Sequence, residues 1–135
     1  RGVLFGWDHK DVTSGRVASA QTLSGTGALR MIGEFLAKFR PAAIYVSNPT
    51  WGNHNSVFKN CGLDVRQYRY FDKKTKGLDF NGMVEDLRNA TPGSCVLLHT
   101  CAHNPTGVDP TLDQWKTLAS VCRENKLYPF FDTAY

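Results

Sequence analysis

Residues 95–110 read CVLLHTCAHNPTGVDP, and this stretch joins a buried strand to a helix through a polar loop. The continuous apolar run at 95–98 is typical of a strand that is buried on both faces, as in a parallel sheet. Asp109 followed by Pro110 predicts the start of a helix, with an N-cap and then a proline in the first turn. The loop between them follows the carboxyl end of the strand, where open α/β sheets bind ligands. The stretch therefore predicts an α/β fold with a ligand site at this edge.

The rest of the chain alternates between strand and helix patterns in the same way. Three further short apolar segments, at 44–46, 65–71 and 128–131, predict strands. Strands that alternate with helices imply a largely parallel sheet, because parallel strands are joined by crossover helices that pack on its faces. We therefore expect an α/β three-layer sandwich with a mostly parallel sheet.

Four helices are predicted around these strands, and each has an apolar stripe at helical spacing that we expect to be buried. Pro41 stops the first helix, Gly62 ends the second where a left-handed cap costs little, and Asp79 caps the third. The stripes consist of Leu29, Ile32, Phe35, Leu36 and Phe39; His54, Val57, Phe58 and Cys61; Met83, Val84 and Leu87; and Trp115, Leu118, Ala119 and Cys122.

The composition favours one soluble domain, or a piece of one. The chain has 135 residues, 41% of them hydrophobic, and a mean hydropathy of -0.35. This mixture is too apolar for a disordered tail, and it contains no apolar run long enough to span a membrane. The chain starts at Arg1 without a methionine and stops at Tyr135 directly after an aromatic run, so we expect a part of a larger domain.

The formal net charge of +4 and the pI near 9.0 admit nucleic acids or acidic small molecules as partners. The densest basic cluster is Lys73, Lys74 and Lys76, which has no aromatic platform beside it and is interpreted as a solvated turn. We therefore expect no nucleic acid and no membrane among the partners.

The four cysteines include no Cys-x-x-Cys pair and are too dilute for a disulfide scaffold, so a reducing compartment fits best. Cys95, His99, Cys101 and His103 alternate and would share one face of an extended strand. Four residues strung along a strand cannot hold one metal ion without a turn, so we predict no metal site.

The segment SGTG at 24–27 opens a predicted helix and presents free backbone amides, two small hydroxyls and the positive end of a helix dipole. Such a segment binds anions, and a plain helix cap is the equal alternative. The dinucleotide fingerprint does not fit, because Arg30 stands where its third glycine would pack against the strand. A phosphate group that is not part of a usual nucleotide suits the segment better.

Asp132 ends an aromatic strand, where a carboxylate is costly unless it meets a cation or several donors. A buried cationic ring nitrogen would satisfy it, and an N-cap for a following helix is the equal alternative. His54 and His99 could each donate a hydrogen bond to this carboxylate, or else be hydrogen-bonded core residues. Trp51 lies in a loop with no apolar stripe to join, which favours either ring stacking or loose cover of the core.

Four segments together resemble one enzyme family. They are SGTGALR (24–30), NPTWGNH (48–54), HTCAHNPTGVDP (99–110) and FFDTAY (130–135). In this order and spacing they closely resemble the aspartate aminotransferases, which are pyridoxal-phosphate enzymes of fold type I. The resemblance implies that residues 1–135 form a part of the large, cofactor-binding domain, and that the rest of that domain and the small domain lie outside the chain.

The resemblance implies a role in binding pyridoxal 5'-phosphate for several of these residues. Ser24, Gly25 and Thr26 would hold the phosphate. Trp51 would stack on the ring and border the substrate. Asp132 would keep the ring nitrogen protonated, so that the ring can act as an electron sink.

Other residues would complete the site by the same resemblance. His54 and His99 would lie behind the aspartate that meets the ring nitrogen. Asn104 and Tyr135 would hydrogen-bond the phenolic oxygen of the cofactor, and Asn104 would also reach the carboxylate of the substrate.

The resemblance also implies what the chain lacks. In this family a lysine on a later segment forms the Schiff base with the cofactor, and arginines grip the carboxylates of the substrate. No lysine here stands in the matching context, so we expect no catalytic residue within the chain and no transamination by these residues alone. By the same resemblance, Pro49 and Pro105 would follow cis peptide bonds.

The implied activity is the transfer of an amino group between L-aspartate and 2-oxoglutarate, which gives oxaloacetate and L-glutamate. The alternatives are an aromatic-amino-acid aminotransferase of the same subgroup, and a non-catalytic module that binds a phosphate ligand on the same fold. The resemblance further implies small-molecule substrates, a homodimer, and a location in the cytoplasm or the mitochondrial matrix.

Overall fold

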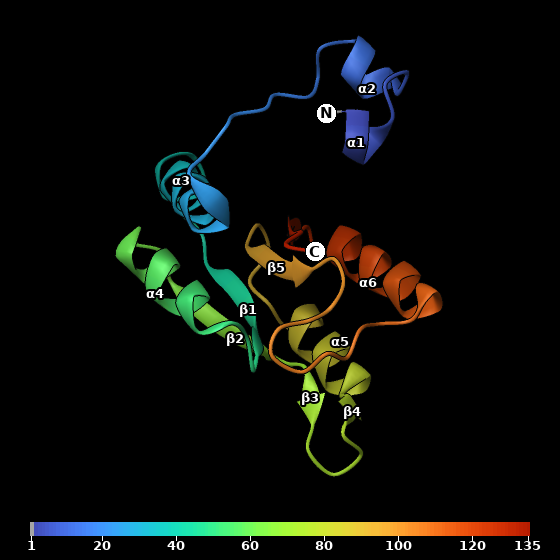
Figure 1. Cartoon of the computed structure of the whole chain (residues 1–135). Coiled ribbons are helices and arrows are strands. Elements are labelled where there is room, and N and C mark those ends of the chain that lie inside the picture. The colour runs from blue at the N-terminus through green and yellow to red at the C-terminus, as the bar shows by residue number, and fades with distance from the viewer. Residues whose placement is uncertain (1) are drawn as a thin grey trace.

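A four-stranded sheet forms the centre of the computed structural model, which describes residues 2–135, with side chains from Leu4 onward (Figure 1). The strands lie in the order β2-β1-β5-β6, and each neighbouring pair is parallel. They are β1 (Ile44–Asn48), β2 (Val65–Arg69), β5 (Cys95–His99) and β6 (Tyr128–Asp132). The prediction of a mostly parallel sheet is confirmed.

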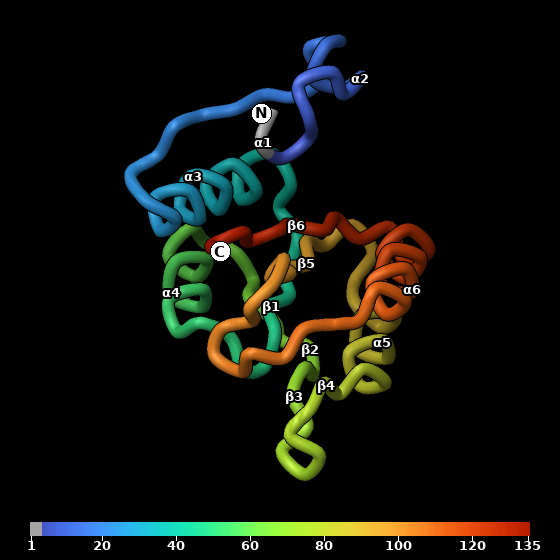
Figure 2. Tube along the Cα trace, turned by 45° about the vertical axis from the view of Figure 1, so that its right-hand side comes forward, coloured from blue at the N-terminus to red at the C-terminus, as the bar shows by residue number. Residues whose placement is uncertain are grey.

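Helices cover both faces of this sheet, with α3 and α4 on one side and α5 and α6 on the other (Figures 1 and 2). The four helices are α3 (Ser24–Phe39), α4 (Gly52–Asn60), α5 (Phe80–Arg88) and α6 (Leu112–Glu124). Successive strand residues point to opposite faces, so Leu97 of β5 packs in the cluster with α3 and α4, whereas Leu98 packs in the cluster with α5 and α6. This arrangement confirms the three-layer sandwich and explains why the run at 95–98 is apolar throughout.

Three predicted helix ends are confirmed. The first long helix, α3, ends at Phe39, two residues before Pro41. Gly62 follows α4 with a φ of 80°, the left-handed conformation that glycine adopts at low cost. Asp79 is the N-cap of α5, and its Oδ1 accepts a hydrogen bond of 2.9 Å from the amide of Gly82.

The predicted start of α6 is wrong. The N-cap is Thr111, and its hydroxyl accepts from the amide of Gln114 while the Gln114 side chain accepts from the amide of Thr111. This capping box satisfies two amides that the first turn leaves open, and it places the helix start after Asp109 and Pro110.

Asp109 instead holds the loop that precedes it. Its Oδ2 accepts from the amide of Ala102 at 2.7 Å, and its Oδ1 accepts from the amide of His103 at 2.9 Å. The carboxylate is therefore engaged by backbone amides seven and six residues earlier, and it is not available as a cap.

The predicted strand at 65–71 is shorter than expected. The register of β2 with β1 ends at the pair Asn48 and Arg69, because β1 is followed by Pro49, which has no amide hydrogen to extend the ladder. Beyond this point β3 (Phe71–Asp72) pairs in antiparallel fashion with β4 (Gly77–Leu78) and forms a separate hairpin.

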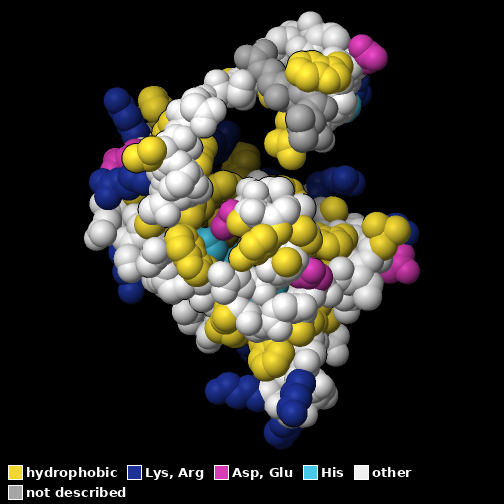
Figure 3. Space-filling view, in the orientation of Figure 1, with side chains coloured by type: hydrophobic (Ala, Val, Ile, Leu, Met, Phe, Trp, Pro, Cys, Tyr) yellow, Lys and Arg dark blue, Asp and Glu magenta, His cyan; other side chains and the backbone are white. Residues whose placement is uncertain are grey.

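The three lysines at 73, 74 and 76 are exposed at the tip of this hairpin, as expected for a solvated turn. Asp72 tightens the turn by accepting hydrogen bonds from the amide of Lys74 and the hydroxyl of Thr75. The basic side chains stand clear of the sheet at the bottom of Figure 3.

The apolar stripes of α3 and α6 are buried only in part. Leu29 is buried, but Phe35 and Phe39 are 54% and 61% exposed and contact each other on the outer side of α3. In α6 the predicted residues Leu118 and Cys122 are buried together with Val121, whereas Ala119 is exposed. Helical spacing therefore predicted the helices correctly, but it did not fix how wide their buried faces are.

The N-terminal part stands apart from the sheet. α1 (Gly2–Phe5) and α2 (Lys10–Thr13) are joined to α3 by an extended segment (Figure 2). Within residues 2–135, no helix has the length and apolar character needed to cross a membrane.

Candidate functional site

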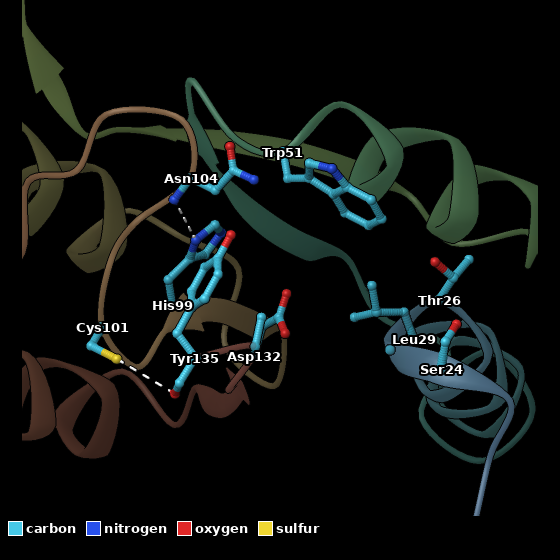
Figure 4. A pocket seen from close by; sticks show the side chains of 11 residues that line it. Ser24, Thr26, Leu29, Trp51, His99, Cys101, Asn104, Asp132 and Tyr135 are labelled. Carbon is cyan, nitrogen blue, oxygen red and sulfur yellow. Dashed lines mark hydrogen bonds between the residues drawn. The ribbon is translucent and has the colours of Figure 1, made fainter.

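A cavity of about 340 Å³ lies at the carboxyl ends of the strands (Figure 4). It is lined by the N-terminus of α3, the loops after β1 and β5, and the segment after β6. In an open α/β sheet these segments meet at the carboxyl ends of the strands, where ligands bind. The lining residues are Ser24, Gly25, Thr26, Leu29, Trp51, His99, Cys101, Asn104, Asp132, Ala134 and Tyr135. All the predicted site residues line this cavity except His54, which lies behind it.

The N-terminus of α3 forms one side of the cavity. Its N-cap is Leu23, which offers no side-chain hydrogen bond, and its first turn contains no acidic residue. Ser24 begins the helix with a φ of 60°, a left-handed conformation that costs a non-glycine residue about 1 kcal/mol. Gly25 has open space where a Cβ would be, so its lack of a side chain leaves room beside the amides. The plain-cap alternative does not hold, and this side offers amides and the Ser24 and Thr26 hydroxyls to an anion.

Asp132 lies on the opposite side, at the end of β6, with its side chain 23% exposed (Figure 4). Its Oδ2 is 2.9 Å from Nε2 of His54, whose side chain is fully buried on α4. Burial lowers the pKa of His54, and the neighbouring carboxylate only partly opposes this effect. The pair is therefore a neutral imidazole that donates to a carboxylate, and the negative charge of Asp132 remains available for a cation in the cavity.

Thr50 links His54 to the next histidine along the cavity wall. Its Oγ1 is 2.7 Å from Nδ1 of His54 and 3.5 Å from Nε2 of His99. Nδ1 of His99 accepts from the backbone amide of Asn104 at 3.1 Å, so the proton of neutral His99 is on Nε2. The hydrogen bonds therefore all donate in one direction. The Asn104 amide donates to His99, His99 to Thr50, Thr50 to His54, and His54 to the Asp132 carboxylate.

Trp51 provides the flat wall of the cavity (Figure 4). It is half-buried against the α3–α4 cluster, and its ring meets the ring of His54 edge-on, with centroids 5.4 Å apart. The indole covers part of the core and also lines the cavity, so ring stacking on a ligand stays a prediction.

Asn104 and Tyr135 face the cavity from the loop after β5 and from the end of the chain (Figure 4). Tyr135 is 74% exposed, and its carbonyl accepts a weak hydrogen bond from Sγ of Cys101 at 3.8 Å. The peptide bonds that precede Pro49 and Pro105 are both cis, as the resemblance implied.

Sequence reasoning missed three lining residues, which are Leu29, Cys101 and Ala134, and it also missed Thr50, whose hydroxyl bonds His54 behind the cavity. Thr50 is four residues before His54, and this spacing could have suggested the hydrogen bond to its Nδ1. Its second partner is 49 residues away, and no local pattern reports such a contact. The described residues contain no group of three or more metal-binding side chains that could hold an ion.

Known proteins resemble this chain over almost its full length. Residues 3–135 match the family model "Aminotransferase class I and II". The cytoplasmic aspartate aminotransferase of Oryza sativa subsp. japonica is 56% identical over 134 residues, which cover 98% of this chain and 33% of that protein. The chain thus spans about a third of the length of the curated relatives it matches.

Solved structures agree with this result. An aspartate aminotransferase from the cytoplasm of Saccharomyces cerevisiae superposes with a TM-score of 0.93 at 41% identity, over 98% of this chain and 32% of that one. An aromatic-amino-acid aminotransferase from Burkholderia pseudomallei, covalently bound to pyridoxal phosphate, gives a TM-score of 0.96 at 43% identity, over 99% of this chain and 34% of that one.

Proposed function

The chain belongs to the class I and II aminotransferase family, and on that premise we propose that it is part of the large domain of a pyridoxal-phosphate-dependent aspartate aminotransferase. The whole protein would transfer the amino group of L-aspartate to 2-oxoglutarate, giving oxaloacetate and L-glutamate. The relatives named aspartate aminotransferase, from 47% to 56% identical, support this substrate pair. The lysine and arginines that the activity needs would lie outside these residues.

One observation carries the proposal. The cavity sets an uncapped helix N-terminus opposite a carboxylate that a neutral histidine holds, with a flat indole between them. Pyridoxal phosphate has the matching groups, namely a phosphate, an aromatic ring and a ring nitrogen that can carry a proton. The residues present therefore fit the cofactor.

Each side of the cavity would hold one part of the cofactor. Ser24, Gly25 and Thr26 would bind the phosphate through amides, hydroxyls and the helix dipole. Trp51 would lie against the ring, and Asp132 would keep the ring nitrogen protonated. Bound in this way, the cofactor supplies an electron sink for the bonds at the substrate Cα.

The remaining polar residues would orient these groups. His54 and His99 would hold Asp132 in place through the hydrogen-bond chain described above. Asn104 and Tyr135 would donate hydrogen bonds to the phenolic oxygen of the cofactor, and Asn104 would also bind a substrate carboxylate.

The test is cofactor binding and turnover by the whole protein. Adding pyridoxal phosphate should produce a visible absorbance band that aspartate shifts, whereas pyridoxal without the phosphate should bind far more weakly. Asp132→Asn should bind the cofactor but lose about 100-fold or more in turnover, because the ring nitrogen loses its charged partner. Asp113→Asn, an exposed change on α6, is the matched control and should behave as the parent. If pyridoxal phosphate produces no spectral change, the cofactor proposal is wrong.

An aromatic amino acid is the alternative substrate, because aromatic-amino-acid aminotransferases superpose as well as aspartate aminotransferases do. Comparing kcat/KM for aspartate with that for phenylalanine decides between the two. A whole protein that binds the cofactor and turns over neither amino acid would instead be the non-catalytic module.

The proposal extends to assembly and location. We infer a homodimer with small-molecule substrates, in the cytoplasm or alternatively the mitochondrial matrix. Relatives from both compartments match the chain. Sedimentation equilibrium of the whole protein tests the dimer, and fractionation of cells that express it tests the compartment.

A further inference from the structure

The loop after β5 makes a turn that carries Asn104 near its apex, and His103 closes this turn. Nδ1 of His103 is 2.8 Å from Oγ1 of Thr106, and the amide of Gly107 donates to the carbonyl of His103 at 2.7 Å. The turn at 103–107 is therefore closed by a side-chain bond and by a backbone bond.

The other ring nitrogen of His103 fastens the turn to the sheet. Nε2 is 2.8 Å from Oγ of Ser47 on β1, 56 residues earlier in the sequence. Ser47 is paired in the sheet register with Tyr68 on β2, whose hydroxyl donates to the carbonyl of Leu97 on β5 at 2.8 Å. His103 thus connects the turn to β1, in the middle of the sheet.

The hydrogen bonds around His103 favour one tautomer of its neutral imidazole. The amide of Val108 donates to Oγ1 of Thr106 at 3.2 Å, and the Thr106 hydroxyl proton is free to point to Nδ1 of His103. In that tautomer Nε2 carries the proton and donates to Ser47. In this arrangement of a neutral imidazole, every hydrogen bond from the Val108 amide to Ser47 has one donor and one acceptor.

The surroundings keep His103 neutral. Its side chain is 1% exposed and stacks on the ring of Tyr70 at 3.8 Å between centroids. Burial and the nearby His99 lower the pKa of His103 to about 4, against the opposing pull of Asp109. The titratable groups that face it are His99 on β5, His54 on α4, Tyr70 and Asp109.

We propose that His103 is a positioning residue, which in its neutral form holds the turn at 103–107 against β1 and so aims the side chain of Asn104 into the ligand cavity. This inference rests on the proposed function, in which Asn104 binds a carboxylate of the substrate. The backbone amide of Asn104 is anchored separately, on Nδ1 of His99. His103 therefore fixes the turn that carries Asn104, and it touches neither cofactor nor substrate.

The first experiment measures kcat and KM of His103→Phe in the whole protein. Phenylalanine keeps a flat ring on Tyr70 but removes both hydrogen bonds. We expect the KM for 2-oxoglutarate to rise about 10-fold, the effect of one lost buried hydrogen bond, with a smaller change in kcat. Leu118→Ala is the control, because Leu118 is a buried residue on α6. This variant should lower the melting temperature without raising KM.

The second experiment needs neither cofactor nor substrate, so it separates a failure of this inference from a failure of the proposed function. Hydrogen exchange of the ligand-free protein should become faster at the amides of Ala102, His103 and Gly107 in His103→Phe. Ser47→Ala removes the same bond from the sheet side, and the double variant should therefore resemble His103→Phe alone. Unchanged exchange at these amides, or a KM in His103→Phe that matches the parent, overturns the proposal.

Discussion

The loops after β1 and β5 both carry cavity residues next to a cis proline, but they are held in different ways. The loop after β1 has only three residues, 49–51, before α4 begins, and its hydroxyl at Thr50 bonds a histidine one helical turn later. The loop after β5 runs over residues 100–111 and is held by Asp109 and by the contact of His103 with β1.

The difference shows two ways to aim a side chain at a ligand. The conformation of a short loop is set by the helix that directly follows it, so local geometry places Trp51 and His54. A long loop has no such guide and needs buried polar contacts with distant elements, which place Asn104. We expect the long loop to respond more strongly to pH and to the loss of single hydrogen bonds.

The largest expected effect is that of pH on the long loop. The pKa of His103 is lowered from 6.5 to about 4, so the unfolded chain binds more protons between these values. The stability that His103 contributes is therefore complete above pH 6.5 and is lost as the pH falls towards 4, by about 3 kcal/mol in total. Urea unfolding of the ligand-free whole protein across this range measures it.

His103→Phe is the comparison for that titration. It should flatten the pH dependence but not abolish it, because burial also lowers the pKa of His54 and of His99 beside the short loop. An equally steep loss of stability in the variant would show that His103 is not the group that titrates.

The next effect compares one threonine from each loop. Thr50→Val and Thr106→Val each remove a hydroxyl that bonds Nδ1 of a buried histidine, at 2.7 and 2.8 Å. Each hydroxyl also accepts from a second donor, Nε2 of His99 at 3.5 Å for Thr50 and the amide of Val108 at 3.2 Å for Thr106. We expect each variant to cost about 1–2 kcal/mol, and Thr106→Val to cost more, because its second hydrogen bond is the shorter one. The shift of the urea midpoint measures both, and a larger cost for Thr50→Val would reverse the comparison.

The same contrast explains what the sequence could predict. Apolar runs and caps fix the strands, α4 and α5 locally, and polar residues at the ends of strands indicate the cavity edge. Asp109 was misread as a helix cap because the amides that it bonds become its neighbours only after the loop folds back. His103 was considered only as a metal ligand, since its partner Ser47 is 56 residues away.

Substitution of Asp109 should have a smaller effect on stability, and this effect should be confined to the long loop. Asp109→Asn leaves one oxygen to accept hydrogen bonds and removes the charge that strengthens both bonds to the amides of Ala102 and His103. Because Asp109 is exposed, we expect a loss of only about 1 kcal/mol. Hydrogen exchange should accelerate at those two amides, whereas Asp113→Asn, in an exposed ion pair with Lys116, should leave them unchanged.

The smallest effect concerns backbone conformation. The long loop contains Ala102 with a φ of 49° and Gly107 with a φ of 66°, and residues 49–51 of the short loop contain no positive φ. Ala102→Gly relieves left-handed strain but adds freedom to the unfolded chain, so we expect a gain of at most about 0.5 kcal/mol. Gly107→Ala meets no atom within 4 Å of its new Cβ, yet it should lose about 1 kcal/mol through strain alone. Opposite shifts of the two urea midpoints would show that backbone strain lies in the long loop, and shifts of the same sign would contradict it.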